Sequence, residues 1–568
     1  MSLRALLAAR VGDALAAAGA AGAAALVAPA TRPEFGDYQA NGVMAAAKSL
    51  RRNPRELAAL VVDHLDLTDI AEDVTVAGPG FINVRLSPAF LSARLGSGGP
   101  LLEQAGALQT IVVDYSAPNL AKEMQVHHLR STIIGDAVAR VLQRLGHHVI
   151  RQNHVGDWGT QFGMLVAHLD EIGTSTDLLA DLERFYQAAR LRFEQDPEFA
   201  DRARRRVVAL QSGDPDARAS WRRFIEVSLE HCEAVYRRLG VLLEPGDLMA
   251  ESAYNDDLAS IVATMEQEGL VTVSDGAKCV LLDTFRGRDG APLPLIVQKS
   301  DGGYLYMTTD LAAARHRCHR LHADRVLYFV DARQAPHFQQ VFAVAKRAGF
   351  AGERCRLEHC AFGMMLGKDG RPFKTRAGDG TRLTELLDEA EQRAFALVSE
   401  KNPSLTESDR REVARAVGIG AVKYSDLSKN RTTDYVFDWG QMLSFDGDTA
   451  PYLQYAYTRI RSLFRRGAVD ASTLTGAPRI EAPAERSLAV SLLRFQEVVD
   501  QVAEDASPHH LCAYLRDLAA AYMQFYEQCP VLNAEPATRT SRLVLCRKVA
   551  DTLHHGLGLL GIETVERM

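Results

Sequence analysis

The pattern of apolar and polar positions predicts a parallel sheet in the middle of the chain. An apolar run at 110–115 is followed by a loop that contains Pro118, by a segment of helical period at 129–145 and by a second strand-like run at 148–153. Another apolar run, at 325–330, is typical of a strand that is buried on both faces. Because parallel strands need a crossover connection, the first three segments predict a βαβ unit.

The segments on either side have a different character. Residues 1–106 combine helical period with a strand-like run at 74–86, and they end in a Gly- and Ser-rich stretch that is typical of a domain boundary. A charged helical pattern before residue 245 indicates an insertion, and helical period dominates from 384 onward. The predicted domains are an α+β domain at 1–106, a Rossmann-like α/β domain at 107–383 with a helical insertion at about 166–245, a helical connector at 384–450 and an all-α bundle at 451–568.

Length and composition agree with an assembly of folded domains. With 568 residues the chain is too long for a single core, and roughly three or four domains are expected. Arg4, Arg10 and Asp13 interrupt the alanine-rich amino end, which is typical of a helix and not of a signal peptide. No uncharged apolar run reaches the length of about 18 residues that a membrane span requires. We therefore expect a cytoplasmic protein without a membrane segment.

The cysteines and the net charge exclude few classes of function. The chain has 8 cysteines without a C-x-x-C pair, and Cys355 and Cys360 have no second ligand pair at metal spacing, so neither zinc nor disulfides are indicated. The formal net charge of −7 argues against indiscriminate binding of nucleic acids. Local basic patches can still hold a folded RNA, so charge alone leaves that question open.

The loop of the predicted βαβ unit carries residues that suit a phosphate group. A helix that begins just after a parallel strand presents backbone N–H groups and the positive end of its dipole. The polar and cationic residues of this loop are Ser116, Asn119, Lys122, Gln125, His127 and His128. No G-x-G-x-x-G pattern follows the strand, which weighs against a dinucleotide. Taken alone, two histidines near a helix end are more often caps, and a lysine there is more often a solvated charge.

The sequence around this loop is similar to that of a known family. It reads VVDYSAPNLAKEMQVHHLRSTIIGDAVARVL, followed by RQNHVGDWGTQFGML. These stretches resemble the catalytic core of bacterial arginyl-tRNA synthetases, which belong to class I. Further matching stretches are PEFGDYQANGVMAAAK, DGGYLYMTTDLAAA, HADRVLYFVDARQ, FGMMLGKDGRPFKTRAG, VGIGAVKYSDLSKNRTTDYVFDW, TAPYLQYAYTRIRS and GIETVERM. They follow the family's order and cover nearly the whole chain, so chance similarity does not explain them.

The resemblance implies a reaction and its substrates. In this family, the carboxylate of L-arginine attacks the α-phosphate of ATP, and the terminal ribose of tRNA(Arg) takes the arginyl group from the adenylate. Mg²⁺ accompanies the ATP, and no metal ligand from the protein is expected. The amino-terminal module of the family contacts the tRNA elbow, and its carboxyl-terminal bundle binds the anticodon. A monomer is the usual state of the family.

The resemblance also assigns roles to residues that match the family's motifs. The catalytic residues that it implies around the phosphates are Lys122, Gln125, His127, His128 and Lys374. Asp114 and Asp310 are expected to face the guanidinium, because its paired N–H donors match carboxylate oxygens. The other expected arginine contacts are Ser116, Asn119, His154, Tyr306 and Gln334, and the expected ATP contacts are Gly156, Asp157, Gln161 and His337.

Three of these roles have simple structural alternatives. Without the family match, Asp114 would more often be a strand-end cap and Tyr306 an ordinary core aromatic residue. Lys374 lies in the segment that matches the family's degenerate KMSK loop, and a solvated loop position explains it equally well.

The expected tRNA contacts fall at the two ends of the chain. They are Phe35, Asp37, Tyr38, Gln39 and Asn41 near the amino end, and Tyr455, Tyr457, Arg459 and Met568 in the carboxyl-terminal part. Aromatic rings and guanidinium groups stack on unpaired RNA bases, which suits the second set. The alternatives are a tight turn around Gly36 that packs a small domain, and tyrosines at helical spacing that form the core of a bundle.

The chain departs from the family at its nucleotide-binding signature. Where the family carries His-x-Gly-His, the chain reads Gln125-Val126-His127-His128. Gln125 can donate a hydrogen bond but has no imidazolium charge, and loss of such a contact costs ~10²–10³-fold in rate in comparable cases. The resemblance implies that the family's glycine allows close approach of the backbone to adenine, so the side chain of His127 is expected to intrude there unless the loop moves.

Two hypotheses follow from this departure. The first is an active arginine–tRNA ligase, and the second is a relative that binds arginine or tRNA with weakened or altered ATP chemistry. An unrelated nucleotidyl transferase on the same fold is disfavoured, because the matches in the arginine site are specific.

Overall fold

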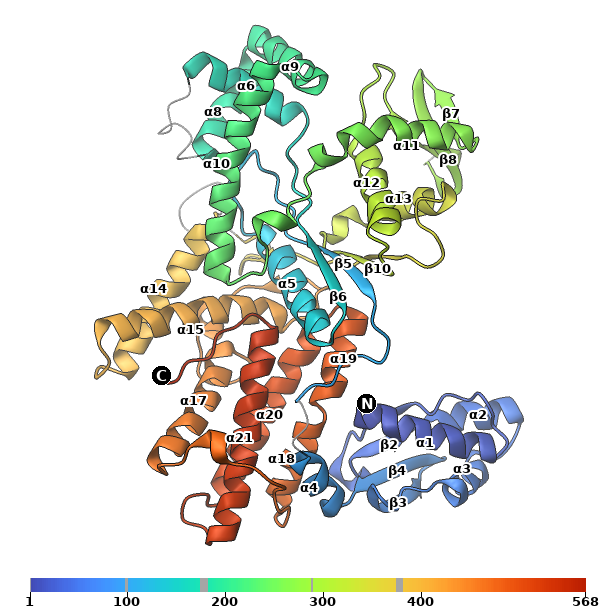
Figure 1. Ribbon diagram of the computed structural model, residues 1–568, viewed down its shortest axis with the longest axis vertical. Coiled ribbons are helices and arrows are strands. Elements are labelled where there is room, and N and C mark those ends of the chain that lie inside the picture. The colour runs from blue at the N-terminus through green and yellow to red at the C-terminus, as the bar shows by residue number, and fades with distance from the viewer. Residues whose placement is uncertain (1, 98–100, 174–181, 288–289, 374–381) are drawn as a thin grey trace. The chain divides into compact units, whose positions relative to one another are not determined.

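The structure, a computed structural model, describes residues 2–97, 101–173, 182–287, 290–373 and 382–568 (Figure 1). The chain divides into two compact units. One unit contains residues 1–106, 444–558 and 563–568, and the other contains residues 107–443 and 559–562. We call them the terminal unit and the central unit, and each is described by itself.

The central unit is built on a parallel four-stranded sheet with the strand order β11-β10-β5-β6. The strands are β5 (Thr110–Asp114), β6 (His148–Gln152), β10 (Arg325–Tyr328) and β11 (Arg356–His359). The chain runs from β5 to β6 on one side and returns to place β10 on the other side of β5. The strand order therefore reverses at β5, and open α/β sheets bind ligands beyond the carboxyl ends of the strands at such a point.

The βαβ unit forms because its residues suit both the strands and the crossover helix. Four of the five residues of β5 are buried, as expected for a strand covered on both faces. The helix α5 (His128–Arg144) packs closely on the end of this strand, because a Cβ atom at Gly135 would lie 2.3 Å from the Cβ of Tyr115. The Ser131 hydroxyl also donates a 2.6 Å hydrogen bond to the carbonyl of Phe329, just after β10.

Helices surround the sheet and extend from it (Figure 1). The insertion after β6 consists of α6 (Thr160–Ile172), α8 (Leu182–Gln195), α9 (Pro197–Ser212) and α10 (Pro215–Leu239). The remaining helices of this unit are α11 (Asn255–Gln267), α12 (Tyr306–Arg315), α13 (Ala335–Arg347), α14 (Leu383–Lys401), α15 (Glu407–Leu427) and α16 (Trp439–Met442). A hydrophobic core joins β10 to α11, α12 and α13.

Smaller elements of the central unit complete it. Its short helical turns are η2 (Pro245–Asp247), η3 (Glu251–Tyr254), η4 (His316–Arg320) and η5 (Ala332–Gln334). The antiparallel sheet of β7 (Val271–Ser274), β8 (Ala277–Arg286) and β9 (Pro292–Gln298), and the parallel pair of β12 (Met365–Leu366) and β13 (Tyr435–Val436), are outside the sequence prediction. β7, β12 and β13 have only 2 to 4 residues, too few for a periodic pattern, whereas β8 and β9 contain apolar runs that the prediction did not assign.

The terminal unit combines an α+β domain with a helical bundle. Its antiparallel sheet has the order β1-β2-β4-β3, with β1 (Val27–Pro29), β2 (Tyr38–Ala40), β3 (Ala71–Ala77) and β4 (Phe81–Leu86). The helices of the amino-terminal part are α1 (Leu3–Ala17), α2 (Gly42–Leu50), α3 (Pro54–His64) and α4 (Pro88–Gly96), with the turn η1 (Pro33–Phe35). The bundle consists of α17 (Ala450–Arg466), α18 (Pro483–Leu493), α19 (Phe495–Asp505), α20 (His509–Gln528) and α21 (Pro536–Leu559), with the turn η6 (Ala471–Thr473).

One covalent feature differs from the sequence prediction. Cys318 in η4 and Cys355 just before β11 form a disulfide, although their separation of 37 residues matches no recognisable cysteine pattern. Their Cα atoms lie 5.9 Å apart because both residues pack in the core beside β10. The expectation of no disulfide was therefore wrong for this pair, since only the folded chain brings the two side chains together.

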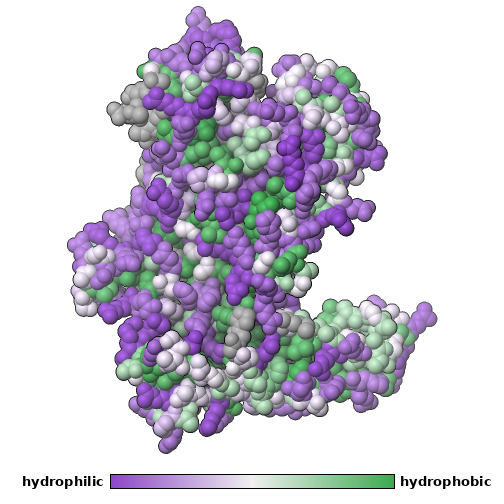
Figure 2. All heavy atoms as spheres, in the orientation of Figure 1, coloured by the Kyte–Doolittle hydropathy of each residue, from purple (hydrophilic) through white to green (hydrophobic). Residues whose placement is uncertain are grey.

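The surface is mostly polar. Hydrophilic residues cover most of the face shown in Figure 2, and apolar residues occupy smaller patches between them. None of the helices in the described ranges combines the length and the apolar composition that a bilayer crossing requires.

Candidate active site

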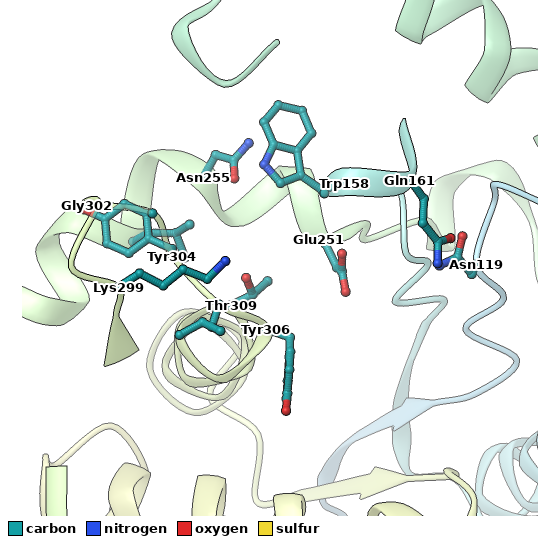
Figure 3. A pocket seen from close by; sticks show the side chains of 14 residues that line it. Asn119, Trp158, Gln161, Glu251, Asn255, Lys299, Gly302, Tyr304, Tyr306 and Thr309 are labelled. Atoms are coloured by element: carbon teal, nitrogen blue, oxygen red, sulfur yellow. The ribbon is translucent and has the colours of Figure 1, made fainter. Parts of the chain in front are cut away.

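A cavity of about 560 Å³ opens at the carboxyl ends of the central strands. Its lining comes from the loops after β5 and β6, from η3, from the segment after β9 and from the start of α12 (Figure 3). The lining residues with polar or aromatic side chains are Asn119, Trp158, Gln161, Glu251, Asn255, Lys299, Tyr304, Tyr306 and Thr309. Three of the sequence-predicted residues, Asn119, Gln161 and Tyr306, therefore meet at one cavity.

The wall formed by η3 carries the carboxyl group of Glu251, and two further carboxylates lie near it. Burial raises the pKa of Glu251 to about 8, and the neighbouring carboxylates of Asp310 and Asp157 contribute to the rise. In Figure 3 the Glu251 side chain points into the same space as Tyr306 and Thr309. Carboxylates close to one another resist ionisation together, and a bound cation relieves their repulsion. This wall is therefore suited to a positively charged group.

Two histidines orient the carboxylate of Asp310. The Nε2 atom of His337 lies 2.6 Å from Oδ2 of Asp310, and Nε2 of His154 lies 3.7 Å from Oδ1. His154 is fixed in turn by a 2.9 Å hydrogen bond between its Nδ1 and the carbonyl of Met249. The ring of Tyr306 packs edge-on against His337 at 4.8 Å. Four residues that the resemblance assigned to arginine or ATP thus form one connected group.

Asp114 has a different environment. Its side chain is buried at the end of β5, where Oδ2 accepts a 2.8 Å hydrogen bond from Nη2 of Arg317. Arg317 is fully buried, and its Nε donates a 2.7 Å hydrogen bond to Gln152 at the end of β6. Its guanidinium also lies over the ring of Tyr328 at the end of β10. Asp114 therefore faces a guanidinium that belongs to this chain.

The register of the sheet explains this arrangement. Asp114 pairs with Tyr328 on one side and with Gln152 on the other, so the three residues form a row across the sheet. Burial by itself lowers the pKa of a guanidinium, but Asp114 and the nearby Tyr328 and Tyr254 raise that of Arg317 above its usual value. Arg317 thus ties three strand ends together, and no motif in the sequence indicated its role.

Other predicted substrate residues form hydrogen bonds within the protein that hold the loops around the site in place. The hydroxyl of Ser116 is buried and lies 2.8 Å from that of Tyr236, and Thr132 donates to it at 2.9 Å. Asp157 is buried and accepts hydrogen bonds from the backbone and the hydroxyl of Ser252, which anchors η3. Gly156 pairs with Asn119 in a short bridge between two loops.

The loop between β5 and α5 begins with two residues of left-handed backbone. Ser116 has a φ of 70° and Ala117 a φ of 44°, which is unusual for residues with a side chain. Strained backbone of this kind persists where the surrounding contacts hold it, and it is frequent at functional sites. Here the Ser131 hydroxyl binds the Ser116 N–H at 2.9 Å and the Asn153 side chain binds the Ala117 N–H at 3.0 Å.

The altered signature gathers at the start of α5. The rings of His127 and His128 lie 4.0 Å apart, and Nδ1 of His128 accepts a 2.9 Å hydrogen bond from the backbone N–H of Gln125. His127 is the exposed N-cap residue of the helix and makes no side-chain capping bond. The N–H groups of His128 and Leu129 bond to carbonyls of the preceding turn, so two of the donors expected to be open are occupied. The positive end of the helix dipole remains at this position.

His128 is neutral at physiological pH. Burial lowers its pKa to about 3, and the charges of His127 and Lys122 contribute to the decrease. Because Nδ1 accepts a hydrogen bond, the proton of the neutral ring is on Nε2. His128 can therefore donate one hydrogen bond to an oxygen atom, but it brings no positive charge.

Two further expectations concern positions beyond this group. Lys374 lies outside the described residues. Gln334 is exposed at the end of η5. Within the described ranges no group of three or more His, Cys, Asp or Glu side chains could hold a metal ion.

In the terminal unit, Asp37 and Tyr38 are engaged by the helical bundle. Both carboxylate oxygens of Asp37 accept hydrogen bonds from Arg486, at 2.8 and 2.7 Å. Tyr38 is fully buried and its hydroxyl lies 2.5 Å from Glu497. Gly36 has a φ of 80°, and a Cβ atom there would lie 2.6 Å from the Val84 carbonyl, so the turn requires glycine. These contacts agree with the structural alternative for this motif.

Phe35 and Gln39 are less buried than Tyr38, whereas Asn41 has a buried side-chain oxygen. Gln39 donates a 2.8 Å hydrogen bond to Asn83, and Phe35 is partly exposed in η1. The side-chain oxygen of Asn41 is buried and has no hydrogen-bond partner among the described residues.

The carboxyl-terminal set divides into exposed and buried members. Tyr455 is 38% exposed on α17, whereas Tyr457 is buried, and its hydroxyl bonds to Glu566 at 3.2 Å. The guanidinium of Arg459 lies over the ring of Tyr526 at 4.7 Å, and Met568 is partly exposed. The core alternative therefore applies to Tyr457 and not to Tyr455.

Sequence reasoning missed several residues that line the cavity. Glu251 is the most important of them, because its carboxyl group lines the cavity and has a raised pKa. Trp158 lies beside the predicted Gly156 and Asp157, and Lys299 and Tyr304 precede the predicted Tyr306. The only available signal was that neighbourhood, since Glu251 itself stands alone in a segment without a recognisable motif.

Comparisons with known proteins agree with this architecture. The family model "tRNA synthetases class I (R), catalytic domain" matches residues 91–439. "Arginyl tRNA synthetase N terminal domain" matches residues 3–86, and "DALR anticodon binding domain" matches residues 453–568. The parallel sheet with its helical insertion, the loop before α5 and the helical bundle thus define a class I tRNA synthetase fold.

Individual relatives cover the whole chain. The arginine–tRNA ligase of Laribacter hongkongensis is 56% identical, with 100% of both chains covered. The crystal structure of the arginyl-tRNA synthetase from Plasmodium falciparum has a TM-score of 0.87 at 27% identity and covers 100% of this chain and 99% of that one. The Thermus thermophilus arginyl-tRNA synthetase has a TM-score of 0.85 at 28% identity, with 100% of both chains covered. The chain belongs to the arginyl-tRNA synthetase family.

Proposed function

We propose that this chain joins L-arginine to tRNA(Arg) in an ATP-dependent reaction that passes through an arginyl-adenylate. The observation that carries this proposal is the buried carboxyl group of Glu251, which lines the cavity, lies near the carboxylates of Asp310 and Asp157, and has a pKa of about 8. Such a site gains most from a ligand whose charge cannot be lost, and a guanidinium stays protonated at any physiological pH. Full-length similarity to arginine–tRNA ligases supports the same reaction.

In this proposal, Asp310 and Glu251 bind the arginine side chain. His337 and His154 lie next to the two carboxylate oxygens of Asp310, so this carboxylate is oriented before the substrate arrives. Tyr306 packs on His337 and flanks the amino acid, and Asn119 lines the cavity on the side of the nucleotide loop. Asp114 acts on this site through Arg317, which aligns the ends of β5, β6 and β10. We assign it a positioning role.

The nucleotide loop is proposed to bind ATP at the start of α5. Lys122 supplies positive charge to the phosphates, His128 donates its Nε2–H, and the helix dipole adds to the favourable potential. Gln125 contributes a neutral hydrogen bond where the family has a histidine. Mg²⁺ neutralises phosphate charge when it is bound with the nucleotide. For the attack, the arginine carboxylate has to be held in line with the α-phosphate. Asn119 and Tyr306 line the cavity and help to position the amino acid for this step.

The remaining expectations concern tRNA, assembly and location. We propose that Tyr455, which is exposed, and Arg459 contact anticodon bases, and that Phe35, Gln39 and Asn41 contact the tRNA elbow. Asp37 and Tyr38 would maintain the shape of that surface from within. We also propose a monomer located in the cytoplasm, in keeping with the family.

Arginine-dependent ATP–pyrophosphate exchange tests the reaction directly. The assay is run with and without tRNA on the unmodified chain, on Gln125→His, on His127→Gly and on the double variant. We expect exchange by the unmodified chain, and its rate then measures how far the altered signature has changed ATP chemistry. Exchange that is detected only after reversion would support the alternative, a binding protein with weakened ATP chemistry, which the changes at Gln125 and His127 favour.

A further inference from the structure

The helical insertion contacts the nucleotide loop through one face of α8. The ammonium of Lys122 lies over the ring of Tyr186, 4.3 Å from its centroid. One turn earlier on the helix, Oε2 of Glu183 accepts a 3.4 Å hydrogen bond from the side-chain amide of Gln125. Residues three apart on a helix lie on the same face, so a single surface of α8 reaches two residues of the loop.

The two contacts are supported from within the insertion. Tyr186 is 7% exposed, so its ring has a fixed place. The neighbouring residue Phe185 points elsewhere and packs against Phe224 at 5.9 Å and His168 at 5.0 Å. The second oxygen of Glu183 accepts a 3.2 Å hydrogen bond from Gln187 on the same helix. The face of α8 that meets the loop is therefore distinct from the face that forms the core of the insertion.

An aromatic partner suits a lysine that has to bind phosphate. A lysine side chain has many rotamers, and holding it in one place costs conformational entropy. A carboxylate would fix the ammonium but would also cancel its charge. A ring face attracts the ammonium through its quadrupole and leaves the net charge intact. Among the described residues the Lys122 ammonium forms no ion pair, so the ring is the partner that restrains it.

We propose that Tyr186 is a positioning residue whose ring holds the Lys122 ammonium at the phosphate site. Glu183 likewise positions Gln125, through a hydrogen bond to its side-chain amide. This inference rests on the proposed role of Lys122 in binding ATP. It assigns the helical insertion a part in the first step of the reaction. It also gives Gln125 a partner, which fixes the amide in the position where the family has an imidazole.

Steady-state aminoacylation with ATP as the varied substrate tests the role of Tyr186. Tyr186→Leu removes the ring, and we expect it to lower kcat/KM for ATP by about 3- to 10-fold, with KM for arginine unchanged. Tyr186→Phe keeps the ring and is expected to restore at least half of the lost activity. Phe185→Leu is the matched control, because it removes a neighbouring buried ring from the core of the insertion.

The outcomes separate a positioning role from general loosening of the insertion. Equal losses in Tyr186→Leu and Phe185→Leu would overturn the inference, as would an equal rise in KM for ATP and for arginine. A loss in Tyr186→Phe as large as that in Tyr186→Leu would also overturn it, since the ring face is then irrelevant.

The Lys122→Ala variant distinguishes failure of the inference from failure of the proposed function. If Lys122→Ala leaves kcat/KM for ATP unchanged, the role of Lys122 itself is wrong. If it lowers this value, Tyr186→Leu is then introduced into Lys122→Ala as a double-mutant cycle. We expect no further loss in the double variant. An additional 3- to 10-fold loss, about the same as in the single variant, would show that Tyr186 acts independently of Lys122.

Discussion

The two aspartates that the sequence assigned to the guanidinium of arginine differ in how their charge is balanced. At the end of β5, Asp114 is buried and its charge is balanced by Arg317, at 2.8 Å. On α12, Asp310 contacts only the imidazoles of His337 and His154 among the described residues, and it lies close to the carboxylate of Glu251. In the first region the charge of the aspartate is balanced by an arginine of this chain, whereas in the second the aspartate has no arginine or lysine partner among the described residues and lies near a second carboxyl group.

This difference indicates that Asp114 contributes to the stability of the fold, whereas Asp310 is suited to substrate recognition. A buried carboxylate that is paired within the protein contributes to the fold, and removing its partner leaves an uncompensated charge. Carboxylates that lack a cationic partner destabilise each other until a cation binds. Asp310 and its neighbour Glu251 are therefore the carboxyl groups that remain available to a cationic substrate, and Glu251 becomes charged when that substrate binds.

The largest effect is expected on stability, from Arg317→Met. This change leaves Asp114 buried without its cation, and we expect a loss of about 3–5 kcal/mol in the free energy of unfolding. The 3 tryptophans, Trp158, Trp221 and Trp439, all belong to the central unit, so their fluorescence during urea unfolding reports on it. The double variant Asp114→Leu/Arg317→Met should recover much of the loss. A single variant as stable as the unmodified chain would contradict the structural role of this pair.

The next effect is expected on catalysis, from Asp310→Asn. The amide oxygen can still accept the hydrogen bond of His337, but the charge that faces the guanidinium is lost. We expect kcat/KM for arginine to fall ~100-fold, with unfolding changed little. Asp257→Asn is a suitable control, because Asp257 lies on α11, where its charge is balanced by Arg315 at 3.2 Å. Arginine kinetics that are the same in both variants would remove Asp310 from the guanidinium site.

The smallest effect concerns the pH dependence of arginine binding. Because the pKa of Glu251 is raised to about 8, its carboxyl is mostly neutral at pH 7 in the free protein and becomes charged as the pH rises. Binding of a guanidinium favours the charged form, so the affinity for arginine should increase about tenfold from pH 7 to pH 9. Glu251→Gln should lack this increase.

Calorimetry of both proteins over this range checks the prediction. Titration of the amino group of arginine is common to both and cancels in the ratio of their affinities. Binding to the unmodified chain at pH 7 should also release a proton, which is measured in buffers of different ionisation enthalpy. Parallel pH profiles for the two proteins would show that Glu251 does not meet the guanidinium.

Much of the framework could be predicted from the sequence. The apolar runs located β5, β6 and β10 to within two residues, and the helical period located α5 to within one. The family resemblance is confirmed, together with the fold class and the arginine–tRNA ligase reaction. Periodic patterns are reliable for these elements because burial on a strand or a helix repeats along the sequence. The site residues and the domain bounds remain predictions.

The nearest neighbours of each site residue could not be predicted. Arg317 follows α12 in a segment without a motif, yet it joins the ends of three strands. Glu251 is 59 residues before Asp310, and Tyr186 is 64 residues after Lys122, so no local pattern connects either pair. Asp37 and Tyr38 likewise meet Arg486 and Glu497 from the other end of the chain.

The sequence by itself determined the kinds of chemistry present: two aspartates for a guanidinium, a loop with a lysine before a helix, and an altered histidine signature. Only the tertiary structure decided which of these charges the protein uses for itself. The physical reason is that the ionisation and availability of a group depend on its burial and on the charges within a few ångströms of it. Those neighbours come from segments that are distant in the sequence, and only folding brings them together.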